Sequence, residues 1–394
     1  MVGLCWYVTG AKRGKTERVE DIHMAVNGTS LLATLWDSPT TPSYGADYDY
    51  DNGHAHDNEI VAQKQAPLKS LHMVAVIIYS IAFVLGVTGN GLVIFITGFR
   101  MKRTVNTIWF LNLAVADFIF TFFLPLYVAY TALGFHWPFG KALCKINSAL
   151  AFLNLYASVY FLMVISLDRC ISVVHPVWAQ SHRTPRLASL VALAVWVVAM
   201  ALCFPYLYFR HTAPSQNNKN ITICYNNFDT AGEGATNAER ARRSVMINQA
   251  MIISRFVLSF LIPFTIIMVC YGAIISKLRR KRLARSGKPF KVIAVVIVAF
   301  FLCWFPYHIF SFLEMNYRPE LETVLTVGIP LVSSVAFING CLNPILYVFM
   351  GQDFKGRLRG TLFSAFENAF HEKATSSSGD MRTKSIRKMD SQVI

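Results

Sequence analysis

Seven apolar segments, each long enough to cross a bilayer, constrain this chain more than any other feature. A transmembrane helix needs roughly 20 mostly apolar residues, because the hydrocarbon layer is about 30 Å thick and each helical residue adds about 1.5 Å. The expected spans are 71–98, 106–133, 143–173, 185–208, 244–278, 290–315 and 322–349. With 54% hydrophobic and only 15% charged residues, the chain is too apolar for an ordinary soluble domain. We therefore predict an all-α membrane protein, a seven-transmembrane helix bundle.

The basic residues indicate which side of the membrane each loop faces. A net charge of +15 could suggest a nucleic-acid partner, but the charge lies in short connections between spans. Residues 277–291 alone hold eight Lys or Arg and no acid. Such loops are typical of the cytosolic side, so the charge indicates orientation and attraction to lipid headgroups, and no nucleic-acid binding is expected. The glycosylation sequons at Asn27 and Asn220 fall on the opposite, extracellular side.

The composition divides the chain into four parts. We predict a disordered extracellular tail over 1–70, the transmembrane domain over 71–349, an amphipathic cytosolic helix over 350–370, and a disordered cytosolic tail over 371–394. In the first tail, Tyr48 and Tyr50 alternate with aspartates, which fits either a solvated acidic segment or tyrosine sulfation that attracts a basic ligand. Residues 1–23 differ in character from the polar remainder of this tail, so Met24 is an alternative start of the working protein.

Two cysteines, Cys144 and Cys224, are placed at the outer surface of the predicted bundle. An oxidising compartment favours a disulfide between them, which would pin the loop 210–243 to the third span. The other cysteines of the spans form no metal-ligand pattern, so no metal centre is expected.

An acidic residue, Asp117, falls in the middle of the second span. Placing an ionised acid there costs roughly 2.5–3.5 kcal/mol even on a mild insertion scale, so Asp117 needs polar partners. Residues at comparable depth in other spans are Asn90, Ser158, Asn339 and Asn343. Two interpretations stay open: a cage for an allosteric sodium ion, or a structural hydrogen-bond network between helices. No other cofactor is expected.

Three motifs occur in order along the spans. Asp168-Arg169-Cys170 resembles the Asp-Arg-Tyr signature of rhodopsin-like G-protein-coupled receptors. Residues 303–306, Cys-Trp-Phe-Pro, resemble their Cys-Trp-x-Pro motif, and residues 343–347 match Asn-Pro-x-x-Tyr. Within that family, 111–118 and 347–355 resemble the chemoattractant branch, which holds formyl-peptide, complement anaphylatoxin and chemerin receptors. Residues 224–228 and 282–291 are most similar to the chemerin receptors.

This resemblance implies coupling to a heterotrimeric G protein of the inhibitory class and to arrestin. The residues implied in coupling and activation are Asp168, Arg169, Tyr271, Trp304, Pro306, Asn343, Pro344 and Tyr347. The implied sodium site holds Asn90, Asp117, Ser158, Asn339 and Asn343. Cys170 replaces the usual tyrosine, a departure that we do not expect to abolish coupling. Ser286 stands where some receptors carry an acid that pairs with Arg169, so the resting state is expected to be held less tightly.

Two arginines mark the ligand end. Arg210 ends the fourth span and Arg255 lies about two turns inside the fifth, and an intramembrane arginine is by default a functional-site hypothesis. Planar guanidinium groups suit a carboxylate, although Arg210 could equally snorkel to the surface. The resemblance to chemerin receptors implies that both arginines hold the C-terminus of a peptide. The expected ligand-binding residues are Arg210, Arg255, Glu314, Tyr307 and Tyr127.

We predict a multi-pass plasma-membrane receptor with an extracellular N-terminus and a cytosolic C-terminus. Its expected ligand is a peptide or small-protein chemoattractant resembling chemerin, which drives chemotactic, inflammatory or adipokine signalling. The alternatives are a receptor for formyl peptides, complement fragments or a lipid mediator, and a scavenger receptor that does not signal. A retinal-type pump is disfavoured because 322–349 contains no lysine. An enzyme is not expected, since no nucleophile–base or metal constellation is found.

Overall fold

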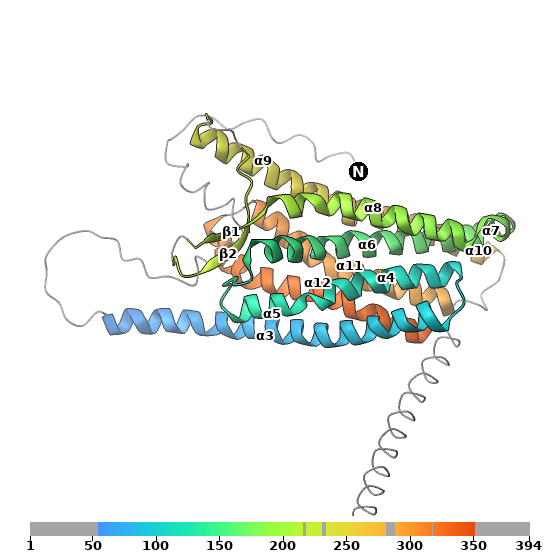
Figure 1. Cartoon of the computed structure of the whole chain (residues 1–394), viewed down its shortest axis with the longest axis horizontal. Coiled ribbons are helices and arrows are strands. Elements are labelled where there is room, and N and C mark those ends of the chain that lie inside the picture. The colour runs from blue at the N-terminus through green and yellow to red at the C-terminus, as the bar shows by residue number, and fades with distance from the viewer. Residues whose placement is uncertain (1–53, 216–217, 231–233, 281–287, 317, 351–394) are drawn as a thin grey trace, which may run out of the picture.

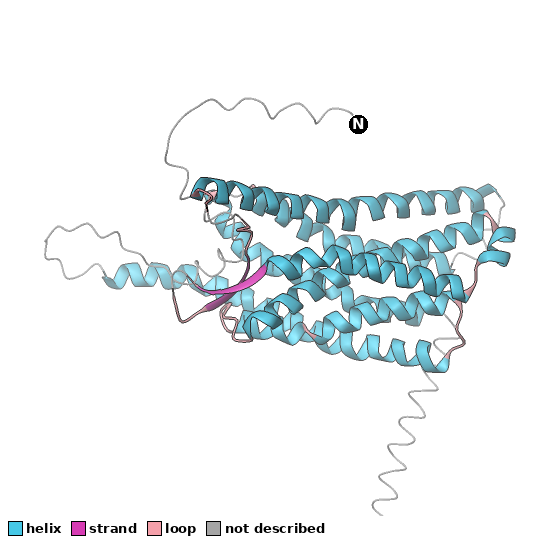
Figure 2. Ribbon diagram, turned by 45° about the horizontal axis from the view of Figure 1, so that its top comes forward, coloured by secondary structure: helices cyan, strands magenta, loops and turns pink. Residues whose placement is uncertain are grey.

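The computed structural model describes residues 54–215, 218–230, 234–280, 288–316 and 318–350. Over these residues the chain forms a bundle of long helices with one β-hairpin at an end (Figures 1 and 2). Seven of these helical segments are long and apolar enough to cross a membrane. The predicted all-α, seven-transmembrane fold is therefore confirmed.

The first four spans follow the expected order. They consist of α3 (His54–Phe95) with the π-helical turn Ile96–Arg100, α4 (Val105–Phe122) with α5 (Leu124–Ala132), α6 (Gly140–Val174), and α8 (Pro185–Phe209). A short helix, α7 (Pro176–His182), connects α6 to α8. The hairpin comes next as β1 (Arg210–Pro214) and β2 (Thr222–Asn226), which pair antiparallel with Arg210 opposite Asn226.

The last three spans complete the bundle. They are α9 (Asn237–Phe256) with the π-helical turn Val257–Leu261 and α10 (Ile262–Arg280), then α11 (Lys288–Met315), then α12 (Glu322–Met350) after a short 3-10 turn at Pro319–Leu321. The sequon Asn27, the tyrosines at 48 and 50, Ser286, the helix predicted after Met350 and the C-terminal tail lie outside the described residues.

The first helix begins before the first predicted span. The disordered tail was expected to reach residue 70, whereas α3 already begins at His54. Residues 54–66 contain three Ala and two Gln, which have high helix propensity, but they do not continue the apolar run of the span. The first helix therefore continues beyond the stretch that needs to be in lipid.

The third span, α6, lies deepest in the bundle. Of the residues in its most apolar window, 67% are buried, against 28% for α3 and α8. It packs against α4, α8 and α10, so a movement of α6 changes its contacts with three other spans.

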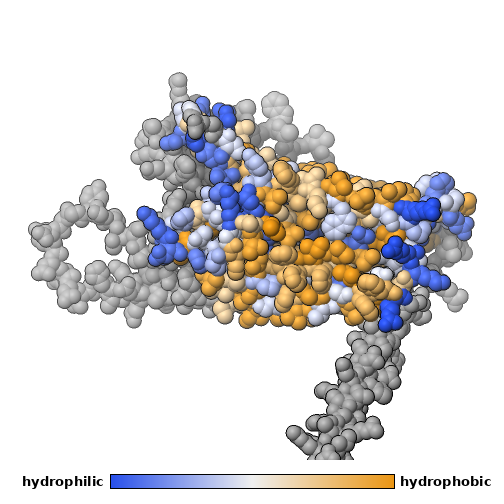
Figure 3. Space-filling view, in the orientation of Figure 1, coloured by the Kyte–Doolittle hydropathy of each residue, from blue (hydrophilic) through white to orange (hydrophobic). Residues whose placement is uncertain are grey.

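The outer surface of the bundle is apolar. On α8 the exposed side chains Leu190, Leu193, Val197, Met200 and Phe204 succeed one another at helical spacing. Figure 3 shows a broad hydrophobic band across the middle of the molecule, with hydrophilic residues gathered toward the two ends. Such a surface is stable in hydrocarbon and not in water, which makes this a multi-pass membrane protein.

Candidate functional site

A cavity of about 230 Å³ opens at the hairpin end of the bundle, between the helices and β1–β2. Its wall is mostly aromatic, with a few polar groups, which is typical of a ligand site. The predicted ligand residues all line it: Arg210, Arg255, Glu314, Tyr307 and Tyr127. The structure thus brings together side chains that come from widely separated segments of the sequence.

The hairpin that forms one wall is fixed to the third span. A disulfide joins Cys144 of α6 to Cys224 of β2, with a Cα–Cα distance of 5.9 Å, as the sequence predicted. The loop before α6 adds two bonds, because the Trp137 N–H donates to the Thr222 carbonyl (2.7 Å) and the Thr222 N–H donates to His136 Nδ1 (3.0 Å). These contacts set the position of the strand ends that border the cavity.

Arg255 is a buried cation between two aromatic rings. Its guanidinium carbon lies 5.3 Å from the ring centroid of Phe152 and 5.1 Å from that of Tyr307, both within cation–π range. One terminal nitrogen donates to Ser311 Oγ at 3.0 Å, while the buried Nε has no hydrogen-bond partner. The side chain is therefore held in place and still has a donor to offer.

Arg210 approaches the same cavity from β1. Its Nη1 donates to Asn226 Oδ1 at 3.0 Å, and its Nε is buried without a partner. Burial holds the pKa of Arg210 below its ordinary value, since desolvation disfavours the charged form. Among the residues that the structure describes, neither Arg210 nor Arg255 forms an ion pair with a carboxylate. Two guanidinium groups with unused donors suit a ligand carboxylate.

Trp304 lies in the wall of this cavity, on α11. The ring is 4% exposed and meets Tyr307 edge to face, with centroids 5.6 Å apart. Pro306 comes two residues later inside the same helix and removes one backbone hydrogen bond there. Pro344 likewise lies in the interior of α12. A bulky ring thus lies beside a proline break in the wall of the cavity.

Farther along the bundle, Asp117 is fully buried and its two oxygens accept three hydrogen bonds. Asn154 Nδ2 and Ser158 Oγ donate to Oδ1 at 2.8 and 3.2 Å, and Asn343 Nδ2 donates to Oδ2 at 2.5 Å. Asn154 was missed by the sequence prediction, although it precedes Ser158 by four residues and so shares its helix face.

Two of the predicted cage residues are not bonded to Asp117. Asn90 Nδ2 instead donates to the carbonyls of Gly86 (2.9 Å) and Gly340 (2.7 Å), and Asn339 Nδ2 is buried without a partner. The Oδ1 of Asn90 is also buried without a partner, so it is an acceptor that a cation could use. The direct contacts of Asp117 form an interhelical hydrogen-bond network, which is one of the two interpretations of this cluster.

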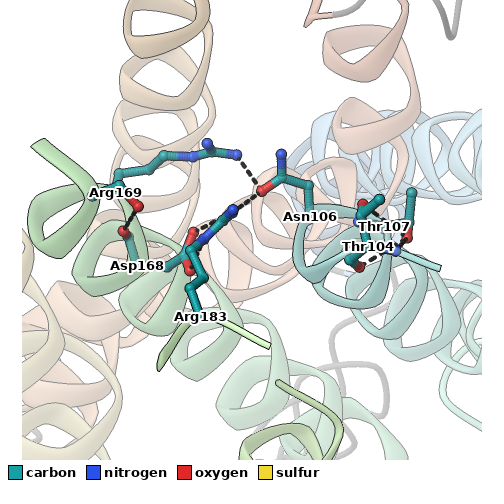
Figure 4. A network of polar contacts seen from close by, with 7 residues as sticks. Thr104, Asn106, Thr107, Asp168, Arg169 and Arg183 are labelled. Atoms are coloured by element: carbon teal, nitrogen blue, oxygen red, sulfur yellow. Dashed lines mark hydrogen bonds and ion pairs between the residues drawn. The ribbon is translucent and has the colours of Figure 1, made fainter. Parts of the chain in front are cut away.

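At the opposite end of the bundle, Asp168 and Arg169 have different partners (Figure 4). Arg183 binds Asp168 with both prongs, Nε to Oδ1 at 2.7 Å and Nη2 to Oδ2 at 3.0 Å. Arg169 Nη2 donates to Asn106 Oδ1 at 2.8 Å, and Arg183 also donates to that oxygen. The Tyr271 hydroxyl is buried without a partner. The side chain of Tyr347, on α12, lies beyond those that the structure describes.

The chain is similar to receptors throughout its transmembrane part. Residues 89–347 match the family model of the 7 transmembrane receptor (rhodopsin family). Chemerin-like receptor 1 of Sus scrofa is 45% identical over 341 residues, which cover 85% of this chain and 93% of that receptor. Chemerin-like receptor 1 of Homo sapiens is 44% identical over 349 residues (87% and 91%). Chemerin-like receptor 2 of Homo sapiens is 41% identical over 334 residues (84% and 89%).

Proposed function

Because this chain belongs to the rhodopsin family of seven-transmembrane receptors, we propose that it is a plasma-membrane receptor for a chemerin-like protein or peptide. It is a receptor rather than an enzyme, as its family and its relatives are receptors. The ligand assignment rests on one observation, the guanidinium groups of buried Arg255 and half-buried Arg210, each with a buried Nε that has no partner, in one cavity. A peptide that enters C-terminus first would place its carboxylate between them.

In this proposal the hairpin end of the bundle faces the cell exterior. The exposed sequon residue Asn220 lies in the hairpin turn, close to the disulfide, and both features belong outside the cell. The N-terminus is then extracellular and the C-terminus cytosolic, with Arg169 at the cytosolic face. Glycosylation of Asn27 and Asn220 is expected from the same orientation.

The signal would pass from the cavity to the cytosolic end through the helices around Trp304. A ligand above Trp304 would shift α11 at Pro306, and α12 with Asn343, Pro344 and Tyr347 would move with it. Arg169 would then leave Asn106 and meet a G protein of the inhibitory class, with Tyr271 supplying a free hydroxyl to its new position. Arrestin would bind the same opened face. Sodium bound near Asp117 would stabilise the closed packing.

The test is a cellular cyclic-AMP assay. Cells that lack chemerin-like receptors and express this chain should lower forskolin-stimulated cyclic AMP when chemerin is added, and pertussis toxin should abolish the response. Formyl peptides, complement fragments and lipid mediators serve as the comparison ligands, and arrestin recruitment is measured in parallel. Arrestin recruitment without any cyclic-AMP response would replace the signalling role with scavenging, and a response to another ligand alone would overturn the chemerin assignment.

A further inference from the structure

The arginine of the Asp168-Arg169-Cys170 motif is not held by its neighbouring acid. Both oxygens of Asp168 are engaged by Arg183, and the aspartate side chain is only 9% exposed. A bidentate guanidinium–carboxylate pair is the strongest arrangement open to these groups. Asp168 makes no hydrogen bond to Arg169 and attracts it only through longer-range electrostatics, so the direct contact that positions this arginine comes from another group.

That group is the amide of Asn106. Its Oδ1 accepts from Arg169 at 2.8 Å and also from Arg183, so both lone pairs of one oxygen are used by two cations (Figure 4). The Nε of Arg169 is buried and has no partner, which leaves Asn106 as the one side chain of the described residues that accepts from Arg169.

Asn106 is itself held firmly by the start of α4. Thr104 is the N-cap, and its side chain accepts from the Thr107 N–H at 3.2 Å, while Thr107 Oγ1 accepts from the Thr104 N–H at 2.8 Å. This capping box fixes the first helical turn, which carries Asn106. The oxygen that holds Arg169 thus belongs to a rigid point on a different span.

We propose that Asn106 is the positioning residue for Arg169, and that Arg183 assists by removing Asp168 from competition. This inference rests on the proposed coupling to a G protein, because it states what restrains Arg169 before coupling. When Arg169 leaves Asn106, the unpartnered hydroxyl of Tyr271 on α10 is available to it. The strength of the Arg169–Asn106 contact then sets the agonist-independent activity of the receptor.

The first test is basal nucleotide exchange on a purified inhibitory G protein, with purified full-length receptor in lipid nanodiscs and no ligand. Asn106→Ala should raise basal exchange about tenfold or more, because a hydrogen bond to a charged group is lost from the restrained state only. Asn106→Asp keeps the oxygen and adds a charge, so basal exchange should return to the wild-type level or below it.

Arg183→Ala is the matched control, since it breaks contacts in the same network but frees Asp168 to hold Arg169. Its basal exchange should not rise above that of the wild type. If both alanine variants raise basal exchange, the network has loosened in general and the proposal is overturned. It is also overturned if basal exchange in Asn106→Asp stays as high as in Asn106→Ala. Unchanged exchange in Asn106→Ala, with normal exchange on addition of chemerin, also overturns it.

A second measurement does not depend on coupling. The Tm values of the wild type, Asn106→Ala, Arg169→Ala and the double variant in detergent form a double-mutant cycle. We expect the shifts to be non-additive by about 2 °C or more, since the two side chains share one contact. Additive shifts would show that the contact is absent. If wild-type receptor with chemerin fails to accelerate any inhibitory G protein while the cycle is non-additive, the proposed function fails and the contact itself stands.

Discussion

Replacing Arg255 with alanine separates ligand recognition from folding. Arg255 donates one hydrogen bond to Ser311, and Ser311 keeps its own bond to the Tyr307 carbonyl (3.0 Å) when the arginine is removed. No carboxylate of the described residues loses an ion-pair partner. The remaining losses are the two cation–π contacts, about 0.5–2 kcal/mol each, and a longer-range electrostatic attraction to Glu314. Surface expression should therefore stay close to that of the wild type.

Binding should suffer much more. A ligand carboxylate that enters the cavity would be desolvated and left without one of its two cations, and truncating one partner of such a pair costs roughly 2–5 kcal/mol. At about 1.4 kcal/mol per factor of ten, the affinity for chemerin should fall roughly 30- to 4,000-fold. Arg255→Lys keeps the charge without the planar guanidinium group, so its affinity for chemerin should lie between those of the wild type and Arg255→Ala.

The assay is competition binding of a labelled chemerin peptide, with surface expression measured on the same cells through an epitope tag. Arg242→Ala is the matched control, because this arginine lies on the same helix, α9, but is exposed and does not line the cavity. A peptide with an amidated C-terminus tests the chemistry, since it should bind wild type and Arg255→Ala almost equally. An unchanged affinity of Arg255→Ala for the native peptide would refute the carboxylate clamp. It would also be refuted if Arg255→Ala lowered the affinity for the amidated peptide as much as it lowers the affinity for the native peptide.

Three further perturbations test other parts of the molecule. Cys224→Ala should lower surface expression and chemerin binding together, because the hairpin loses a link worth roughly 2–5 kcal/mol, and normal binding at normal expression would speak against that role. Asp117→Asn should remove any weakening of agonist binding by sodium, which is measured by exchanging sodium for N-methylglucamine. If the variant remains sensitive to sodium, Asp117 does not bind the ion and its cluster is a structural network only. Asn220→Gln should increase electrophoretic mobility as much as deglycosylation of that site does, and an unchanged mobility would contradict an extracellular hairpin.

The number and order of the spans could be predicted because lipid imposes one simple rule, a long apolar helix, on each crossing. The ends of the helices obey other rules. The fifth span was expected from residue 244, but α9 begins at Asn237 after a capping box in which Thr236 and Glu239 bond each other's backbone N–H groups (3.3 and 3.0 Å). The Thr-x-x-Glu pattern that signals this start is present in the sequence. A polar helical stretch is therefore added outside the apolar run.

Some residues of the candidate sites could be predicted from the sequence, and others could not. Arg255 and Asp117 stood out because charge in a membrane span is costly, and the structure places Asp117 in a polar cluster and Arg255 between two aromatic rings. The partners of Arg169 could not be found this way. Asn106 is an ordinary polar residue near a span end, and Arg183 reaches Asp168 because the short helix α7 brings the chain back toward the end of α6. That contact depends on the fold of a connecting loop, for which the sequence offers no periodic pattern.

Reconstituted nucleotide exchange examines the proposed signalling role without the complications of a cell. Purified receptor in nanodiscs is mixed with a purified inhibitory G protein, and the rate of GTPγS uptake is measured with and without chemerin. We expect chemerin to accelerate uptake by the wild type and to have no such effect on an Arg169→Ala variant that still binds it. Chemerin that binds the wild-type receptor but leaves the uptake rate unchanged would contradict a receptor that signals through Arg169.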